Sequence, residues 1–263
     1  MDEPAVLYES SEGVGVLTLN RPDNRNSMTP ELLDAFREAL GRAQADEEAR
    51  CIVITGRGKC FSAGADFKSQ MQREGGGRHR LPHERSYGMY RPFLGVLDLE
   101  VPVIGALNGH AVGGGFGLAL VCDVRYGARD AKYGANFARI GLHPGMGISY
   151  LLPRLVGASK AAELLFTGAL IQGEEAERIG LLSRAVAAEE VLPLAMDAAR
   201  TIAANAPLAV RMTKRTLRRS LGWDVKGAAF DEAFAQAATL ATRDAAEGMA
   251  ALLEKRDPDF KGA

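Results

Sequence analysis

Hydrophobic and polar residues alternate along the chain in blocks that predict first a strand, then a turn, then a helix. Residues 15–19 (GVLTL) form a short β-rich run, and the turn formers at 20–24 end it. Thr29 and Pro30 fit the N-cap and the first position of a helix. The apolar residues of this helix recur four positions apart, with charged residues between them: Leu32, Phe36 and Leu40. This part of the chain therefore predicts a strand, a loop and an amphipathic helix.

Two later blocks predict strands that are buried on both faces. Residues 51–55 (CIVIT) are continuous, apolar and rich in β-branched side chains, and residues 101–107 repeat the pattern. Repeated units of strand, loop and helix favour an α/β fold with largely parallel strands. Residues 70–85 are expected to form a mobile surface segment beside a pocket. The glycine triplet at 75–77 is interpreted as a flexible loop, because no strand precedes it to make a phosphate-binding turn.

From residue 189 to the end the pattern is helical. We expect four helices, over residues 191–204, 207–221, 224–241 and 242–255. Their alanine and leucine faces are too long for a small helical tail to bury alone, so they are expected to pack on the α/β body or on a neighbouring subunit. A basic run in the second helix is interpreted as a solvated or subunit-facing surface: Lys214, Arg215, Arg218 and Arg219. We divide the chain into an α/β core at 1–200 and a C-terminal helical region at 201–263.

Charge and cysteine content exclude several classes of function. The chain has 32 Lys and Arg against 33 Asp and Glu, and a net charge of -1 gives no global field to attract nucleic acid or an anionic membrane. The 3 cysteines are too few and too scattered for a disulfide framework, and no spacing typical of metal ligands appears. The N-terminus lacks the basic start and apolar core of a signal peptide, so a cytoplasmic location is expected.

The apolar stretch at 101–122 is long enough to cross a bilayer. It also contains Pro102, Asn108, His110 and several glycines, which are costly in lipid and poor in a continuous helix. We therefore interpret it as a buried strand, a turn and a helix, and we expect no membrane association.

Two glycine-containing turns are suited to expose backbone N–H groups. The first lies at 61–67, and the second at 108–117, where a strand is expected to end and a helix to begin. Two N–H donors that converge on one oxygen stabilise the enolate or tetrahedral oxyanion formed from a thioester. Either turn alone also fits plain close packing.

Several motifs give the chain a specific family resemblance. The AGAD turn at 63–66, NGHAVGGG at 108–115, CDVRYGA from Cys122 and the closing EGMAALLEKRDPDFKG together resemble the crotonase (enoyl-CoA hydratase/isomerase) superfamily. The resemblance runs from Asn20 to Phe260. It implies a crotonase-like repeated β-β-α spiral core, a C-terminal helical oligomerisation region and assembly as a homotrimer or a hexamer. It also implies an acyl-CoA substrate and no separate cofactor.

The resemblance assigns roles to individual positions. The two oxyanion donors correspond to the backbone N–H groups of Ala65 and Gly114. Contacts to the CoA moiety correspond to residues of the first loop and the first turn: Arg25, Asn26, Ala63, Asp66 and Phe67. Lys68 and Phe260 are further candidates for the nucleotide end, Phe260 from a neighbouring subunit. Independently of the family, a guanidinium such as that of Arg25 pairs well with phosphates, while Asp66 fits a turn-organising role better than a catalytic one.

The departures from the family pattern concern its acids. Enoyl-CoA hydratases carry two glutamates that act on the water, and this chain has Gly117 and Phe137 at those positions. Some isomerases and a dehalogenase carry an acid where Gly145 stands here. Ordinary two-glutamate hydration is therefore not expected. Phe137 also makes the acyl pocket more apolar, which favours a hydrophobic or aromatic acyl group.

Another side chain must then act as the acid or base, and the sequence offers several candidates. His143 is favoured because imidazole titrates near neutrality. Tyr90 fits a wall of the acyl pocket better than a proton donor, and the remaining candidates are His83, Glu84 and Arg139.

Two hypotheses for the function remain: an enzyme that forms an enolate, as hydratase, isomerase, lyase or C–C hydrolase, and a non-catalytic acyl-CoA binder. A serine peptidase and a Rossmann dehydrogenase are disfavoured because GxSxG and GxGxxG are absent.

Overall fold

The strands of the protein form two sheets. The computed structural model describes residues 3–65, 81–220, 222 and 224–260. The six-stranded sheet has the order β1-β2-β3-β5-β7-β10, and the four-stranded sheet has the order β4-β6-β8-β9. The strands are β1 (Val6–Ser11), β2 (Val14–Leu19), β3 (Cys51–Gly56), β4 (Cys60–Ser62), β5 (Val103–Leu107), β6 (His110–Val112), β7 (Val124–Ala128), β8 (Lys132–Gly134), β9 (Ile171–Gln172) and β10 (Arg184–Val186).

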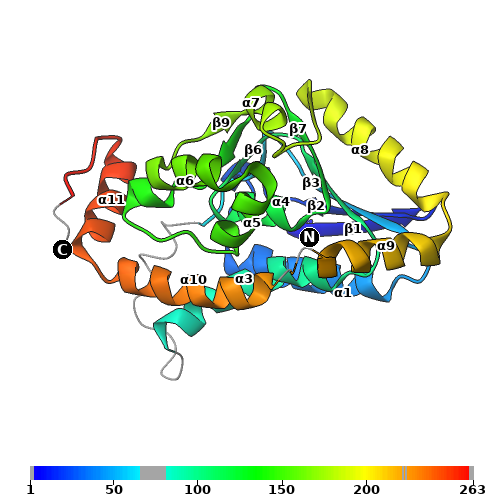
Figure 1. Cartoon of the computed structure of the whole chain (residues 1–263), viewed down its shortest axis with the longest axis horizontal. Helices are drawn as coiled ribbons and strands as arrows, with labels where there is room; N and C mark the ends of the chain where they lie inside the picture. The colour runs from blue at the N-terminus through cyan, green and yellow to red at the C-terminus, as the bar shows by residue number, and fades with distance from the viewer. Residues whose placement is uncertain (1–2, 66–80, 221, 223, 261–263) are drawn as a thin grey trace.

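Helices follow the strands and then dominate the C-terminal part (Figure 1). The α-helices are α1 (Pro30–Ala45), α3 (Pro82–Leu94), α4 (Gly114–Val121), α5 (Ile148–Val156), α6 (Ala158–Thr167), α7 (Gly173–Arg178), α8 (Ala188–Ala203), α9 (Pro207–Ser220), α10 (Val225–Leu240) and α11 (Arg243–Glu254). Three short 3-10 helices are η1 (Pro22–Asn24), η2 (Gly95–Asp98) and η3 (Phe137–Ile140). The helices α8 to α11 agree with the sequence prediction to within a few residues at each end.

The chain order shows a repeated β-β-α unit. β3, β5 and β7 lie in the six-stranded sheet, whereas β4, β6 and β8, which follow them directly, lie in the four-stranded sheet. A helix comes after each pair: α3, α4 and α5. β2, β3, β5, β7 and β10 are parallel, and β1 is an antiparallel edge strand. The predicted α/β fold with a crotonase-like spiral core is confirmed.

Local sequence signals act as expected in the first half of the chain. Thr29 caps α1 by accepting a hydrogen bond at Oγ1 from the N–H of Leu32 at 3.2 Å, and Pro30 occupies the first helical turn. Every residue of β3 and β5 is buried, because helices or the second sheet cover both faces. The predicted surface segment at 70–85 lies outside the described residues up to position 80, and α3 begins at Pro82.

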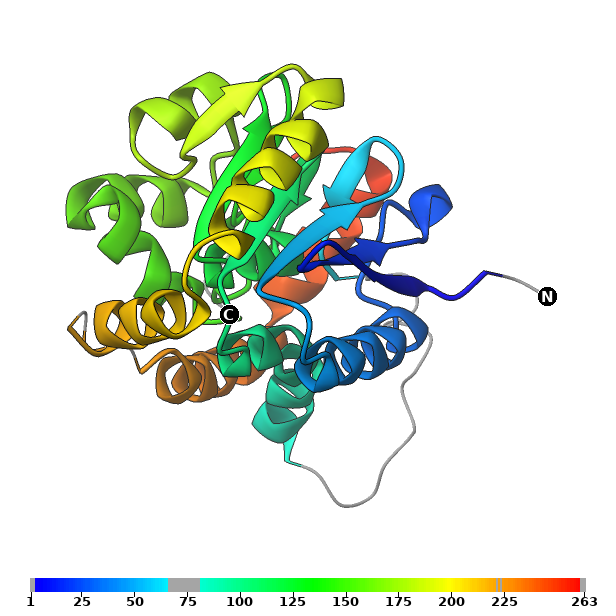
Figure 2. The same ribbon diagram turned by 90° about the vertical axis from the view of Figure 1, so that its right-hand side faces the viewer.

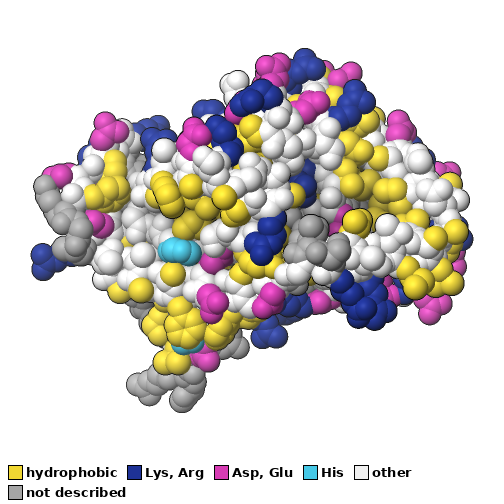
Figure 3. Space-filling model, in the orientation of Figure 1, with side chains coloured by type: hydrophobic (Ala, Val, Ile, Leu, Met, Phe, Trp, Pro, Cys, Tyr) yellow, Lys and Arg dark blue, Asp and Glu magenta, His cyan; other side chains and the backbone are white. Residues whose placement is uncertain are grey.

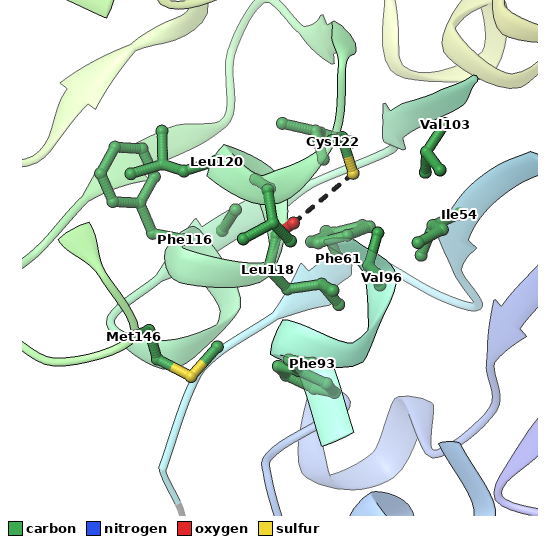
Figure 4. Close-up of a cluster of buried hydrophobic side chains, with 14 of the residues drawn as sticks. Ile54, Phe61, Phe93, Val96, Val103, Phe116, Leu118, Leu120, Cys122 and Met146 are labelled. Atoms are coloured by element: carbon green, nitrogen blue, oxygen red, sulfur yellow. Dashed lines mark hydrogen bonds between the residues drawn. The ribbon is translucent and has the colours of Figure 1, made fainter. Parts of the chain in front are cut away.

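Helices cover the sheets in layers (Figure 2). α8 lies across the six-stranded sheet and contacts β3, β5 and β7. A separate layer lies below the sheets in the view of Figure 1 and consists of α1, α3, α9 and α10. Between α3, α4 and β4 lies an aromatic and aliphatic core that includes Phe61, Phe93 and Phe116 (Figure 4). Phe93 also meets Phe36 of α1 edge to face, with ring centroids 4.8 Å apart.

Two of the four basic residues on α9, Lys214 and Arg218, are largely buried, and the prediction of a solvated surface is wrong for them. Lys214 is 7% exposed, and its Nζ lies 2.8 Å from Asp123 Oδ2 and donates to the Val101 carbonyl oxygen at 2.6 Å. Arg218 donates to the other carboxylate oxygen of Asp123 at 3.0 Å. Burying these charges is tolerable because Asp123 and a carbonyl meet them. Arg215 and Arg219 are exposed, as predicted.

Two kinds of feature are not found in the part of the chain that the structure describes. No helix there has the length and hydropathy needed to span a bilayer. No group of three or more His, Cys, Asp or Glu side chains there has the arrangement of a metal site.

Candidate active site

Three parallel strands of the second sheet end at one edge, and each leads into a predicted site segment. β4 pairs with β6, and β6 pairs with β8, with Ser62 opposite Ala111 and Val112 opposite Gly134. Residues 63–65, 113–114 and 136–137 follow these three strands in turn. Ligands bind outside the carboxyl ends of parallel strands in many α/β proteins. The sequence predicted a strand at 101–107 and a turn at 108–117, whereas the structure has the additional strand β6 within that predicted turn.

The first and second turns touch each other through Gly64 and Gly114. Gly64 has φ +81°, and a Cβ placed on it would lie 2.6 Å from the Val112 carbonyl oxygen and 2.9 Å from the Gly114 nitrogen. Both contacts are with backbone, which cannot move aside as a side chain can. Position 64 therefore requires glycine for its backbone conformation and for its close contact with the second turn.

The N–H groups of Ala65 and Gly114 are free to donate to a ligand. Gly114 is the first residue of α4, where helical N–H groups have no intrahelical acceptor and the helix dipole is positive. Ala65 forms a parallel bridge with Met28, whose own N–H donates to the Gly64 oxygen at 2.8 Å. Among the described residues, no acceptor is found for the N–H of Ala65 or Gly114. Two such donors on touching turns are suited to bind one oxygen.

The first loop runs beside the first turn, so Arg25, Asn26 and Ala63 lie close together. The N–H of Ala63 donates to the Arg25 carbonyl oxygen at 3.0 Å. Arg25 is exposed, and no side chain in the described ranges pairs with its guanidinium. Asn26 is fully buried, and its Nδ2 donates to the carbonyl oxygens of Cys60 at 2.8 Å and Phe61 at 3.1 Å. The Asn26 side chain thus faces inward and fixes the loop.

Three side chains surround the second turn, and two of them were missed from the sequence. The predicted one, Phe137, is buried, with its Cζ 3.8 Å from a Cβ placed on Gly113. The Oδ1 of Asn136 lies 3.9 Å from the same point. The Met28 sulfur lies where a Cβ on Gly114 would be. No local pattern marks Met28 or Asn136, because they reach the turn only through the tertiary fold.

Neighbouring side chains fill the space at Gly117 and Gly145, two of the positions where the family resemblance predicted that acids are missing. A Cβ on Gly117 would lie 2.5 Å from Met146 Cβ and 3.0 Å from Met146 Cγ. A Cβ on Gly145 would overlap the Tyr90 hydroxyl and lie 3.2 Å from Gln236 Nε2. Met146 is 1% exposed and lies in the core near Phe93 and Phe116 (Figure 4). Met146 lies against Gly117, and Phe137 lies near Gly113. Together they form an apolar wall beside the second turn.

One face of α10 holds the loop that contains these positions. Glu232, Gln236 and Thr239 are spaced by four and three residues and point to the same side of the helix. Glu232 accepts from the N–H groups of Gly147 at 2.6 Å and Ser149 at 2.7 Å. Gln236 Nε2 donates to the His143 oxygen at 3.1 Å, and Thr239 Oγ1 accepts from the His143 N–H at 3.0 Å. This arrangement was not predicted from the sequence.

The two predicted acid/base candidates differ in their surroundings. Tyr90 is 3% exposed, its hydroxyl donates to Gln236 Oε1, and burial together with the nearby Glu232 charge raises its pKa. It stays protonated and cannot act as a base at neutral pH. His143 is half-buried, and its Nδ1 lies 2.6 Å from the Pro144 carbonyl oxygen. Because a carbonyl only accepts, this contact favours the tautomer with the proton on Nδ1.

The remaining candidates are engaged elsewhere or lie outside the described residues. The His83 ring stacks on Phe234 with centroids 3.6 Å apart, and Glu84 Oε2 accepts from the Leu81 N–H at 2.9 Å. Arg139 packs its aliphatic part against Gly168. Phe260 is 38% exposed near the C-terminus. Three of the predicted CoA contacts lie outside the described residues: Asp66, Phe67 and Lys68.

The cysteines are poor nucleophiles where they lie. All three are buried. Burial raises the pKa of the Cys60 thiol to about 11 and that of the Cys51 and Cys122 thiols to about 12. The thiolate fraction at neutral pH is therefore very small, and covalent catalysis through cysteine is not supported.

A β-β-α spiral with two touching glycine turns at one sheet edge defines a crotonase-type protein, and comparison with known proteins agrees. The family profile described as enoyl-CoA hydratase/isomerase matches residues 9–263. The chain is 36% identical to the crotonyl-CoA hydratase of Syntrophomonas wolfei over 258 residues, covering 97% of each. A solved enoyl-CoA hydratase/isomerase from Pseudoalteromonas atlantica superposes with a TM-score of 0.86 at 29% identity, covering 98% of this chain and 100% of the other.

A solved monofunctional enoyl CoA isomerase from M. smegmatis superposes with a TM-score of 0.69 at 34% identity, covering 84% of this chain and 96% of the other. This chain belongs to the enoyl-CoA hydratase/isomerase family.

Proposed function

We propose that this protein is an acyl-CoA enzyme that stabilises a thioester enolate with the backbone N–H groups of Ala65 and Gly114. The observation that supports the proposal is the contact between the two turns at Gly64, which brings the Gly114 nitrogen close to the turn that carries Ala65. When a base removes the proton from the carbon next to the thioester carbonyl, the electron pair moves to the carbonyl oxygen. Two fixed donors then stabilise the negative charge on that oxygen.

The acyl-CoA substrate is supported by the surroundings of the two turns. The exposed Arg25 lies beside the first turn, and its guanidinium, which pairs with no side chain in the described part of the chain, can bind a CoA phosphate. Met28, Phe137 and Met146 line the space around Gly113, Gly114 and Gly117, which suits a hydrophobic or aromatic acyl group. The relatives named as hydratase and isomerase act on enoyl-CoA according to their names. Asn26 serves this site by fixing the loop that carries Arg25.

The proton chemistry of this enzyme does not follow the two-glutamate hydration mechanism. Met146 fills the space next to Gly117, and Phe137 stands at the second glutamate position. His143 Nε2 serves as the acid or base, since its lone pair is free while Nδ1 is held by the Pro144 carbonyl. Proton return to a different carbon of the enolate gives an isomerisation, which needs no bound water.

Assembly of several copies is part of the same proposal. The C-terminal helices leave large apolar side chains about half exposed: Leu240, Leu252 and Leu253. Such side chains at the end of the chain support the homotrimer or hexamer that the family resemblance implies. The exposed Phe260 then reaches the nucleotide end of CoA in a neighbouring subunit.

Proton exchange tests the proposed activity. In heavy water, the protein should incorporate deuterium next to the carbonyl of a suitable acyl-CoA, which mass spectrometry detects. It should form no 3-hydroxyacyl-CoA from crotonyl-CoA. His143→Gln should slow the exchange by about 10²-fold, at the lower end of what general acid–base catalysis contributes.

A control variant and two contrary results complete this test. Arg37→Gln, an exposed change on α1, should leave the exchange rate unaltered. Absence of label across acyl-CoAs that bind the protein would instead favour a non-catalytic acyl-CoA binder. That second function has support in the apolar filling at Gly117 and Phe137. Full exchange by His143→Gln would reassign the acid/base role to another group.

A further inference from the structure

A cavity lies between α9 and the segment from η2 to β5, away from the two glycine turns. Its volume is about 430 Å³, within the range of small-molecule sites. The segment before β5 forms one wall, so the cavity lies at the amino end of this strand, whereas the turn with Gly114 follows β6 of the other sheet, and none of its residues lines the cavity. The cavity is therefore separate from the proposed acyl-CoA site.

The apolar part of the wall is open to solvent. Leu208 and Met212, one turn apart on α9, are 71% and 66% exposed. Leu97 and Leu99 line the opposite wall. Covering exposed leucine and methionine side chains with an aliphatic ligand removes apolar surface from water, which is favourable. The cavity therefore favours a ligand with an alkyl chain.

The charged part of the wall has more positive than negative groups. Arg211 pairs with Glu100, and Asp98 pairs with Lys226 at 2.6 Å. Lys214 and Arg218 share Asp123 beneath the cavity. Arg215 and Arg219 also line the cavity, and no acidic group in the described ranges pairs with either.

Hydrogen-bond donors are in excess as well. Among the described residues, the only buried side-chain nitrogen or oxygen without a partner is Arg218 Nε, in a residue of this wall. Figure 3 shows basic and hydrophobic side chains next to each other over the half of the molecule where Figure 1 places α9. Guanidinium groups recognise carboxylate and phosphate with paired hydrogen bonds.

We propose that this cavity binds an alkyl chain that ends in an anionic group, with the chain against Leu208 and Met212 and the anion at Arg215 and Arg219. Fatty acid carboxylates and alkyl phosphates share this chemistry. The site differs from the proposed acyl-CoA site in position and in its contacts, and it does not depend on the enolate chemistry.

Methyl NMR of the whole protein labelled with [methyl-13C]methionine tests the proposal, because the methionines report on the two sites separately. Octanoate should shift the Met212 signal in a saturable way and leave Met28 and Met146 unmoved. Octyl phosphate should act at the same signal, and the comparison tells which head group binds more tightly. Neutral 1-octanol and inorganic phosphate should bind at least about tenfold more weakly, since each lacks one half of the ligand.

Variants test separately the contributions of the ligand's anionic group and of its alkyl chain. Arg215→Gln and Arg219→Gln should each raise the Kd for octanoate about tenfold, while Arg37→Gln on α1 should not change it. Met212→Glu should abolish binding and leave the oligomeric state unchanged. The proposal is overturned if octanoate shifts only Met28 and Met146, if 1-octanol binds as well as octanoate, or if octanoate is inert while Met212→Glu dissociates an oligomer.

Discussion

Gly64→Ala is expected to lower kcat/KM for an acyl-CoA substrate by about 10²–10³-fold, the effect of losing one oxyanion donor. The added Cβ would lie 2.6 Å from the Val112 oxygen and 2.9 Å from the Gly114 nitrogen, so the two turns must separate. Since φ at this position is +81°, the alanine is also strained in its backbone. The separated N–H groups of Ala65 and Gly114 can then no longer meet at one oxygen. Steady-state kinetics of the purified variant measure the loss.

Gly157→Ala is the matched control for this change. Gly157 also has φ +81°, but nothing lies within 4 Å of the Cβ that an alanine would add there. An alanine at this positive φ is also strained in its backbone but does not touch the site, so the activity of Gly157→Ala should equal that of the wild type. Thermal unfolding of both variants shows whether each is folded. A folded Gly64→Ala variant with wild-type kcat/KM would show that the two turns do not act together.

Glu232→Ala is expected to reduce the free energy of unfolding by about 3 kcal/mol, which corresponds to a fall in Tm of roughly 6–12 °C. The variant leaves the N–H groups of Gly147 and Ser149 without their carboxylate acceptor. Gly147 is the N-cap of α5 and Ser149 lies in its first turn, directly after Gly145 and Met146. Loss of this contact also weakens the attachment of α10 to the site. Calorimetry and chemical denaturation measure the change.

Asp231→Ala is the control for Glu232, because Asp231 is the neighbouring acid on α10 and is exposed. Its effect on the free energy of unfolding should stay within about 0.5 kcal/mol. A similar small effect for Glu232→Ala would contradict the role assigned to α10 in holding the loop.

The pH dependence gives a second readout for Glu232. Burial raises the pKa of its carboxyl group above the ordinary value of 4.5. The folded protein therefore binds this proton more tightly than the unfolded chain, and stability falls as pH rises from 4.5 through the raised pKa. The difference in Tm between wild type and Glu232→Gln should change over this window, because glutamine does not titrate. A difference that is constant with pH would exclude the raised pKa.

The larger elements of the fold could be predicted from local patterns. Continuous apolar runs marked β3 and β5, and the Thr29 cap with Pro30 marked the start of α1. The four C-terminal helices were visible because each has its own apolar periodicity. The second sheet was not visible, since β4, β6 and β8 have three residues each and such short strands show no periodicity.

The predicted site segments come together, but the contacts that shape them are long-range. Ala63, Ala65, Gly114 and Phe137 follow neighbouring strands of the second sheet. The contact of Met146 with Gly117 and the hydrogen bond from Tyr90 to Gln236 join residues far apart in the chain, and no local pattern specifies them. For the same reason the burial of Lys214 was missed, because its partner Asp123 lies in another part of the sequence.

The carbonyl stretching frequency of a bound acyl-CoA tests the central claim most directly. Infrared difference spectra of ligands with and without 13C at the thioester carbonyl isolate this single vibration. Binding to the wild type and to Gly157→Ala should lower the frequency below its value in water, because two fixed donors polarise the bond. In Gly64→Ala the shift should be lost. A ligand that is fully bound to the wild type and keeps its aqueous frequency would contradict an oxyanion hole at Ala65 and Gly114.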